Sequence, residues 1–250
     1  MKKILCAAIA TGAIFIGSAI ETKAASFADV VFVVDQSGSM GGEFAWIGNS
    51  ISSINTALVA GGVTAKYGVA GYEYYAGSAA AQNAWLDLTS DINAVVTEVN
   101  SVNVYGGTER GYQAADWSAD NFSWSGGNYA KIMILVTDEP NDYRSSYAYD
   151  GLTGEAALDK KMADEKILLN VITYTNYYQY WDDPAYSRDA YVGLFDLDYL
   201  RTNPSDFTTA FVAAKLKEIQ DVPVPEPTTM LLFGTGLAGL AAVGRRRARK

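Results

Sequence analysis

Two uninterrupted apolar segments constrain the fold of this chain more than any other feature. Residues 30–34 (VVFVV) and 132–136 (IMILV) contain only large apolar side chains, with no polar residue in alternation. Successive side chains of a strand point to opposite faces, so both faces of each segment must be buried. The segments therefore predict two inner strands of a sheet that is covered on both sides.

Helical and extended patterns alternate around these segments. Between residues 44 and 58, apolar residues recur in steps of three and four, which predicts an amphipathic helix. Further strands are predicted over residues 67–75, 84–88 and 168–174, and further helices over 91–100, 108–118, 154–165 and 205–219, the last capped by Ser205. Strands separated by helices predict one α/β domain over residues 26–221, with a mostly parallel central sheet and helices on both faces.

The first 24 residues have the order of a secretory signal peptide. Lys2 and Lys3 precede an apolar stretch over residues 4–20. Thr22 and Ala24 then provide small side chains at the −3 and −1 positions of a signal-peptidase cleavage site. The alternative is a retained N-terminal anchor, because the apolar stretch is uninterrupted. Either interpretation sends the following domain across a membrane.

The end of the chain carries a second apolar segment. Residues 222–227 contain three prolines and predict a stiff linker. Residues 228–244 are uncharged, and their length lies at the lower limit for a transmembrane helix, about 17 residues. Residues 245–250 are basic, and such a cluster stays on the cytoplasmic side of a membrane. The plainest interpretation is a C-terminal transmembrane anchor that holds an exported domain.

The predicted exported part is strongly acidic. The chain contains 19 basic and 28 acidic residues, and eight of the basic ones but only Glu21 of the acidic ones lie in the two ends. The remaining 11 basic and 27 acidic residues give a net charge of −16. A surface of this charge repels phosphate backbones and anionic lipids, which excludes nucleic acid as a partner.

The residue types of common zinc and nucleophile sites are missing from the predicted domain. The sequence has no histidine, and its single cysteine is Cys6, in the predicted signal peptide. Zinc sites of the usual type, cysteine nucleophiles and Ser-His pairs are therefore excluded. A metal site in this domain must use oxygen ligands, which favours magnesium, calcium or manganese.

Oxygen-bearing side chains follow both apolar segments, where each predicted strand ends. Asp35, Ser37 and Ser39 come directly after the first segment, and Asp138 follows the second. Ligands collect beyond the carboxyl ends of strands in an open α/β sheet. If the two strands are neighbours, Asp35 and Asp138 face each other, and a bound cation relieves their repulsion. Thr108, after two glycines, offers another hydroxyl. The alternative is that Asp35 and the serines only cap the following helix.

The Asp35-x-Ser37-x-Ser39 string, followed by Thr108 and Asp138, resembles the metal-ion-dependent adhesion site of von Willebrand factor type A domains. The resemblance spans roughly residues 28–220. It implies a Rossmann-like fold in which the central sheet is mostly parallel, with one antiparallel edge strand and helices around it. It also implies that these side chains hold Mg²⁺, or Mn²⁺ or Ca²⁺, and that a partner's carboxylate takes the free coordination position.

The tail resembles a PEP-CTERM sorting signal. Its three parts are the motif Val224-Pro225-Glu226-Pro227, the short apolar segment and the arginine cluster. The resemblance implies export through the inner membrane of a Gram-negative, exopolysaccharide-producing bacterium and cleavage near the motif by an exosortase-type enzyme. The protein would then be membrane-anchored only transiently, and would end at the cell surface or outside the cell.

Aromatic residues are concentrated in two loops that follow strands at the predicted metal edge, residues 141–153 and 175–191. Rigid amphipathic rings are favoured at recognition surfaces. We predict a ligand-binding rim around the cation that consists of Glu139, Tyr143, Tyr147, Tyr149, Tyr178, Tyr180 and Trp181. The alternative is that these aromatic residues pack onto the domain. Many members of the resembled family have glycine after the last metal-site aspartate, whereas this chain has Glu139-Pro140.

These features predict an exported binding protein. The first hypothesis is cation-dependent adhesion to a protein or matrix ligand that offers a carboxylate. The alternative is a structural matrix protein, in which the cation only stabilises the fold. A chelator would then lower the stability of the domain without abolishing ligand binding. We do not expect an enzyme, because histidine and cysteine are missing and Glu139 is the only general base near the predicted metal loop.

Overall fold

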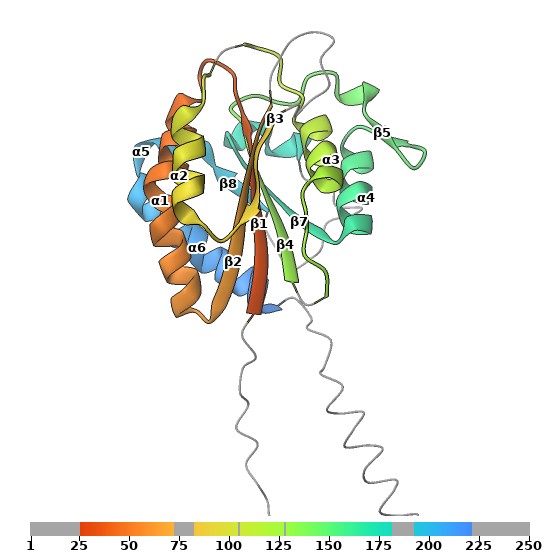
Figure 1. Ribbon diagram of the computed structural model, residues 1–250. Coiled ribbons are helices and arrows are strands. Elements are labelled where there is room, and N and C mark those ends of the chain that lie inside the picture. The colour runs from red at the N-terminus through yellow and green to blue at the C-terminus, as the bar shows by residue number, and fades with distance from the viewer. Residues whose placement is uncertain (1–25, 73–82, 105, 128, 182–192, 222–250) are drawn as a thin grey trace, which may run out of the picture.

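Figure 1 shows a computed structural model of the protein, which describes residues 26–72, 83–104, 106–127, 129–181 and 193–221. The predicted signal peptide (1–24), linker (222–227), apolar segment (228–244) and basic tail (245–250) lie outside the described residues. The end of the strand predicted over 67–75 also lies outside them. Within the described ranges, no helix is long and apolar enough to cross a membrane.

Six strands form one sheet in the order β3-β2-β1-β4-β7-β8. Their bounds are Ser26–Asp35 (β1), Val63–Tyr72 (β2), Asn83–Thr89 (β3), Tyr129–Val136 (β4), Ile167–Thr173 (β7) and Leu194–Asp196 (β8). Neighbouring strands are parallel except β2 and β3, which are antiparallel at one edge. The predicted sheet is therefore confirmed, and the two apolar segments are the adjacent inner strands β1 and β4.

Helices cover both faces of the sheet (Figure 1). One face carries α1 (Gly41–Ala60), α2 (Ile92–Ser101), α5 (Leu197–Thr202) and α6 (Pro204–Asp221), and the other carries α3 (Gly111–Asn121) and α4 (Glu155–Glu165). Alternate residues of β1 enter two separate cores: Val30, Phe32 and Val34 pack on the α1 side, and Val31 and Val33 on the α3 side. Each such side chain stabilises the fold by about 1.5–3 kcal/mol when fully buried, which explains the unbroken apolar pattern.

Short elements fill the two long loops at the carboxyl edge of the sheet. The loop after β4 contains a 3-10 turn, η1 (Arg144–Ser146), and a hairpin of β5 (Ala148–Tyr149) and β6 (Leu152–Thr153). The loop after β7 contains a second 3-10 helix, η2 (Thr175–Tyr180). None of these elements is predicted by the sequence pattern, because each is too short to show a period.

The observed starts of α6 and α3 change the roles of Ser205 and Thr108. α6 begins at Pro204, and the Phe207 amide donates to the carbonyl of Asn203, so Ser205 lies inside the first turn and does not cap the helix. Proline explains the earlier start, since its fixed φ suits a first helical position where no N–H is needed. α3 begins at Gly111, which leaves Thr108 in the preceding loop.

Candidate metal centre

Asp35 and Asp138 lie at the same edge of the sheet, because they follow neighbouring parallel strands. Val34 of β1 pairs with Val136 of β4, one and two residues before the carboxylates. The exposed fractions of Asp35 and Asp138 are 1% and 8%. Burial raises the pKa of Asp35 to about 7, and the negative charge of Asp138 adds to the rise. The prediction that the two strands are neighbours is confirmed. Their adjacency brings two buried carboxylates to the same edge of the sheet.

The Asp35 carboxylate organises the loop that follows β1. Its Oδ1 accepts a hydrogen bond from the Ser37 amide at 2.7 Å, and its Oδ2 accepts one from the Thr137 hydroxyl at 3.1 Å. The hydroxyl oxygens of Ser37 and Ser39 lie 3.2 Å apart. Three predicted ligands of one cation are thus held together in a single turn. Thr137, which the sequence analysis does not single out, joins this turn to β4.

One oxygen of Asp138 is buried without a hydrogen bond. The Oδ2 atom accepts from Nη2 of Arg201 at 3.2 Å, whereas no donor among the described residues reaches Oδ1. A buried carboxylate oxygen without a partner is costly. Oxygen ligands from carboxylates and hydroxyls are those that Mg²⁺ and Ca²⁺ prefer, so the side chains at this edge fit a hard divalent cation.

Thr108 lies half-buried in the loop before α3, directly before the buried Glu109. Burial raises the pKa of Glu109 to about 8, and the negative charge of Asp35 is the next cause, so this loop lies near Asp35. Two hydrogen bonds join this loop to the loop after β4, one between backbone groups and one to a side chain. The Asp142 amide donates to the Glu109 carbonyl at 2.5 Å, and the Glu109 amide donates to Asp142 Oδ2 at 3.3 Å.

Arg201 is a residue of this site that the sequence analysis misses. Its Nε donates to Oε1 of the buried Glu43 at 2.7 Å, and its Nη1 donates to the Tyr174 hydroxyl at 2.5 Å. Its Nη2 donates to the Ser39 carbonyl at 3.3 Å, in addition to Asp138. One guanidinium therefore ties α5 to α1, to the serine loop and to the end of β4. No pattern around Arg201 indicates this role, because it depends on the position of the six-residue α5.

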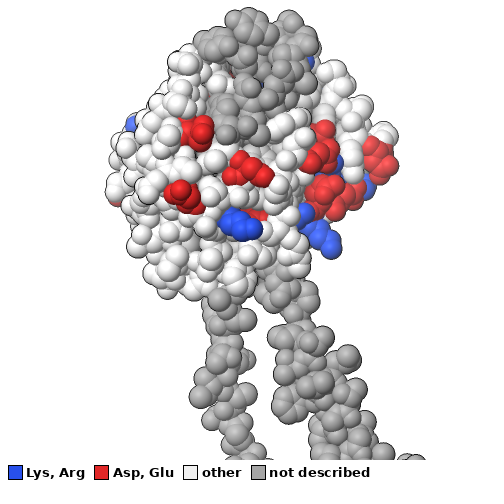
Figure 2. Space-filling view, viewed as in Figure 1, with Lys and Arg blue, Asp and Glu red and all other residues white. Residues whose placement is uncertain are grey.

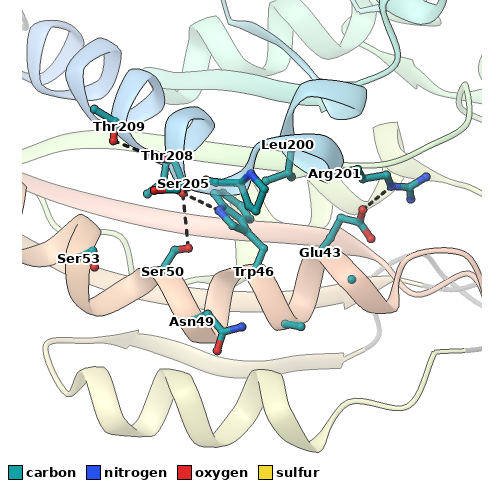
Figure 3. Close-up of a pocket in the computed structure, with 13 residues that line it drawn as sticks. Glu43, Trp46, Asn49, Ser50, Ser53, Leu200, Arg201, Ser205, Thr208 and Thr209 are labelled. Carbon is teal, nitrogen blue, oxygen red and sulfur yellow. Dashed lines mark hydrogen bonds and ion pairs between the residues drawn. The ribbon is translucent and has the colours of Figure 1, made fainter.

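A groove with a volume of about 660 Å³ runs from this ion pair along α1 and α6. Figure 3 shows Glu43 and Arg201 at one end and hydroxyl side chains from both helices farther along it. The indole N–H of Trp46 donates to the Thr208 hydroxyl at 2.9 Å, which fastens α1 to α6 beneath the groove. The groove is separate from the hydroxyls of Ser37 and Ser39.

The predicted rim divides into exposed and buried residues. Glu139 is exposed and Tyr143 is 59% exposed, and Tyr149, Tyr178 and Tyr180 are half-buried. Tyr147 and Trp181 are only 5% and 6% exposed. Both rings meet Tyr112 of α3 edge to face, with centroids 6.1 and 4.9 Å away. For these two residues the rim prediction is wrong, because their loops turn the rings into the core on the α3 side.

Tyr149 also faces away from the metal edge, toward α4. Its hydroxyl donates to Asp164 Oδ2 at 3.2 Å. Tyr180 supports the guanidinium of Arg144, whose Cζ lies 3.9 Å from the ring centroid. Tyr186 and Tyr191 of the second predicted loop lie outside the described residues. Among the described rim residues, Glu139 and Tyr143 are the most accessible to a partner.

Acidic side chains gather on the side of the molecule that α4 covers (Figure 2). The lysines there are paired: Lys160 Nζ lies 2.5 Å from Asp164, and Lys161 Nζ lies 2.5 Å from Asp120 of α3. Asp116 and Glu165 also lie within 4 Å of Lys161, at 3.8 and 3.6 Å. More carboxylates than ammonium groups meet here, so this region keeps a net negative charge.

Comparison with known families identifies two parts of the chain. Residues 29–177, more than half of the chain, match the von Willebrand factor type A domain. Residues 223–247 match the PEP-CTERM protein-sorting motif. No curated protein sequence matches the chain. The sheet and helices continue past residue 177 to the end of α6, so β8, α5 and α6 complete the fold beyond the matched range.

Two solved structures align with this chain at low sequence identity, and the alignment with the first of them supports the same fold. The pilus adhesin SpaC from Lactobacillus rhamnosus GG aligns with a TM-score of 0.50 and 16% identity, over 78% of this chain and 31% of the adhesin. Proximal thread matrix protein 1 from the mussel byssus aligns with a TM-score of 0.49 and 16% identity, over 76% of this chain and 46% of that protein. The chain thus spans less than half the length of either protein. From its sequence match and its fold, the chain belongs to the von Willebrand factor type A domain family.

Proposed function

We propose that this protein is an exported surface or matrix protein that binds a partner through a divalent cation. The cation is held by Asp35, Ser37, Ser39, Thr108 and Asp138. The observation that carries the proposal is the buried Oδ1 atom of Asp138, which lacks a hydrogen bond at an edge where a second buried carboxylate and two serine hydroxyls also lie. Buried negative charge and a carboxylate oxygen without an internal partner favour a bound cation.

Each side chain has a distinct task in this proposal. Asp35 holds the serine loop through the Ser37 amide and the Thr137 hydroxyl, so the loop is pre-formed. Ser37, Ser39 and Thr108 offer neutral oxygens, and Asp138 offers a charged one that Arg201 orients. When bound, Mg²⁺, or Mn²⁺ or Ca²⁺, supplies an electrophilic position for a carboxylate oxygen of a protein or matrix partner. The exposed Glu139 and Tyr143 then border that partner.

The sorting motif supports the proposed location. A PEP-CTERM motif at residues 223–247 agrees with export through the inner membrane of a Gram-negative bacterium and processing by an exosortase-type enzyme. The protein is then transiently anchored by residues 228–244 before it reaches the cell surface or the extracellular matrix. One solved structure of the same fold is a pilus adhesin, which agrees with an adhesive role.

Thermal unfolding tests the cation site directly. A cation at a hundred times its dissociation constant stabilises the folded domain by about 2.7 kcal/mol. For a domain of this size, this corresponds to a rise in melting temperature of about 5–10 °C. We expect magnesium or manganese to raise the melting temperature by this amount over chelator. The rise should be absent in Asp35→Ala and retained in Asp164→Asn, which changes an exposed carboxylate on α4. Equal shifts in both variants would mean that the ion binds elsewhere.

Partner binding separates adhesion from a purely structural cation. In a pull-down from extracellular matrix of the native host, capture should require the divalent ion and should be lost in Asp35→Ala. Capture that persists in chelator, while the melting temperature falls, would instead support the structural alternative.

A further inference from the structure

A cluster of two ionisable side chains and one amide side chain lies in the core, away from the candidate metal centre. Lys215 and Glu218 are on α6, and Asn170 is on β7. Their exposed fractions are 5%, 2% and 0%, respectively. Charged residues are rarely buried to this extent, and the proposed cation site does not use them.

The three polar groups touch one another. Nζ of Lys215 donates to Oδ1 of Asn170 and to Oε2 of Glu218. Nδ2 of Asn170 lies 3.5 Å from the same Oε2 and donates to the Leu168 carbonyl at 3.2 Å. The amine therefore lies against the carboxamide, and a single carboxylate oxygen reaches both the amine and the amide nitrogen.

Apolar surroundings separate this cluster from water. The rings of Phe195 and Phe211 lie 5.0 and 5.7 Å from Nζ of Lys215. Burial lowers the pKa of Lys215, although the charge of Glu218 opposes this effect. In such surroundings a separated ion pair is costly. Transfer of one proton from Lys215 to Glu218 removes both charges and leaves a neutral amine, which is the nucleophilic form of lysine.

We propose that Lys215 and Asn170 become joined by an isopeptide bond and that Glu218 carries the proton in this reaction. Nζ of Lys215 attacks Cγ of Asn170 and forms a new C–N bond. Glu218 accepts a proton from the attacking nitrogen and delivers one to Nδ2 of Asn170. The bond from Cγ to Nδ2 then breaks, and ammonia leaves. No oxidant or reductant is required, because one amide replaces another.

The cysteine content of the chain explains why such a cross-link would be useful. Its only cysteine is Cys6, so the domain cannot be stabilised by a disulfide. An exported domain without disulfides lacks the covalent cross-link that is common outside the cytoplasm. A bond from β7 to α6 would supply one without any redox chemistry. The proposal does not depend on the cation site.

Mass spectrometry of the purified full chain tests the proposal. With the bond, the purified chain is lighter by one ammonia molecule than the calculated mass of the residues that it retains after any processing of its ends. After denaturation and trypsin digestion, residues 167–188 and 202–217 should appear as one joined peptide, uncut after Lys215. The full calculated mass, together with separate peptides and cleavage after Lys215, would overturn the proposal without recourse to any variant.

Two variants of α6 test the role of Glu218. Glu218→Gln keeps the size of the side chain but cannot carry the proton, so we expect the full calculated mass and separate peptides. Asp206→Asn changes an exposed carboxylate on the same helix and should still lose ammonia. Loss of ammonia that is undiminished in Glu218→Gln would exclude Glu218 as the proton carrier.

Discussion

Arg201 brings a permanent positive charge to the edge of the proposed cation site. It contacts Asp138 at 3.2 Å and Glu43 at 2.7 Å, and its side chain is 30% exposed. Arginine stays charged at any physiological pH and binds carboxylates in a fixed geometry. It can therefore hold Asp138 in place, but it also repels a cation that shares the same carboxylate.

Removal of the charge of Arg201 should separate these two effects. We expect Arg201→Met to bind magnesium about tenfold more tightly, which corresponds to about 1.4 kcal/mol. The same variant should be less stable by about 3–5 kcal/mol, because Glu43 becomes a buried unpaired charge. Glu43→Gln in the same chain should restore part of that loss. Calorimetric titration and urea unfolding measure the two quantities, and weaker magnesium binding would show that orientation of Asp138 outweighs repulsion.

Among the elements, those with long apolar patterns are predictable from the sequence, and the short ones are not. β1 and β4 are recognisable because both faces are buried, and their adjacency then places Asp35 beside Asp138. β8 and α5 have three and six residues, so neither shows a period. Because Arg201 lies on α5, the sequence predicts the carboxylates of the site but not the guanidinium that contacts them. Tyr147 and Trp181 show the same limit, since composition alone does not tell which way a loop ring turns.

The position of α3 relative to the sheet depends on a glycine. A Cβ atom at Gly111 would lie 2.7 Å from the Trp181 ring and 3.3 Å from Leu135. We expect Gly111→Ala to push the start of α3 outward, to destabilise the fold by about 1–3 kcal/mol, and to weaken magnesium binding because Thr108 precedes this helix. Gly126→Ala is the matched control, since nothing lies within 4 Å of its added Cβ. Unchanged magnesium binding in a destabilised Gly111→Ala would remove Thr108 from the proposed site.

For the whole molecule, the proposed isopeptide bond changes the unfolded state more than the folded one. Lys215 and Asn170 are 45 residues apart, so the bond would close a long loop. By the chain-entropy model for cross-links, such a loop contributes about 4 kcal/mol. We expect Glu218→Gln to unfold at a lower urea concentration than the parent chain, and to migrate more slowly in a denaturing gel because it lacks the loop. Identical mobility of the two chains would contradict the cross-link.

Both ends of the domain lie at the edge of the sheet opposite Asp35 (Figure 1). The Ser26 amide donates to the Gly62 carbonyl at 3.1 Å, and the Gln220 side chain donates to the Gly61 carbonyl at 3.2 Å. A surface attachment after α6 and a partner bound at the cation edge would therefore pull on opposite ends of the strands. Mechanical load would run along β1 and β4 and strain their hydrogen bonds in shear, so that these bonds share the force instead of opening one after another.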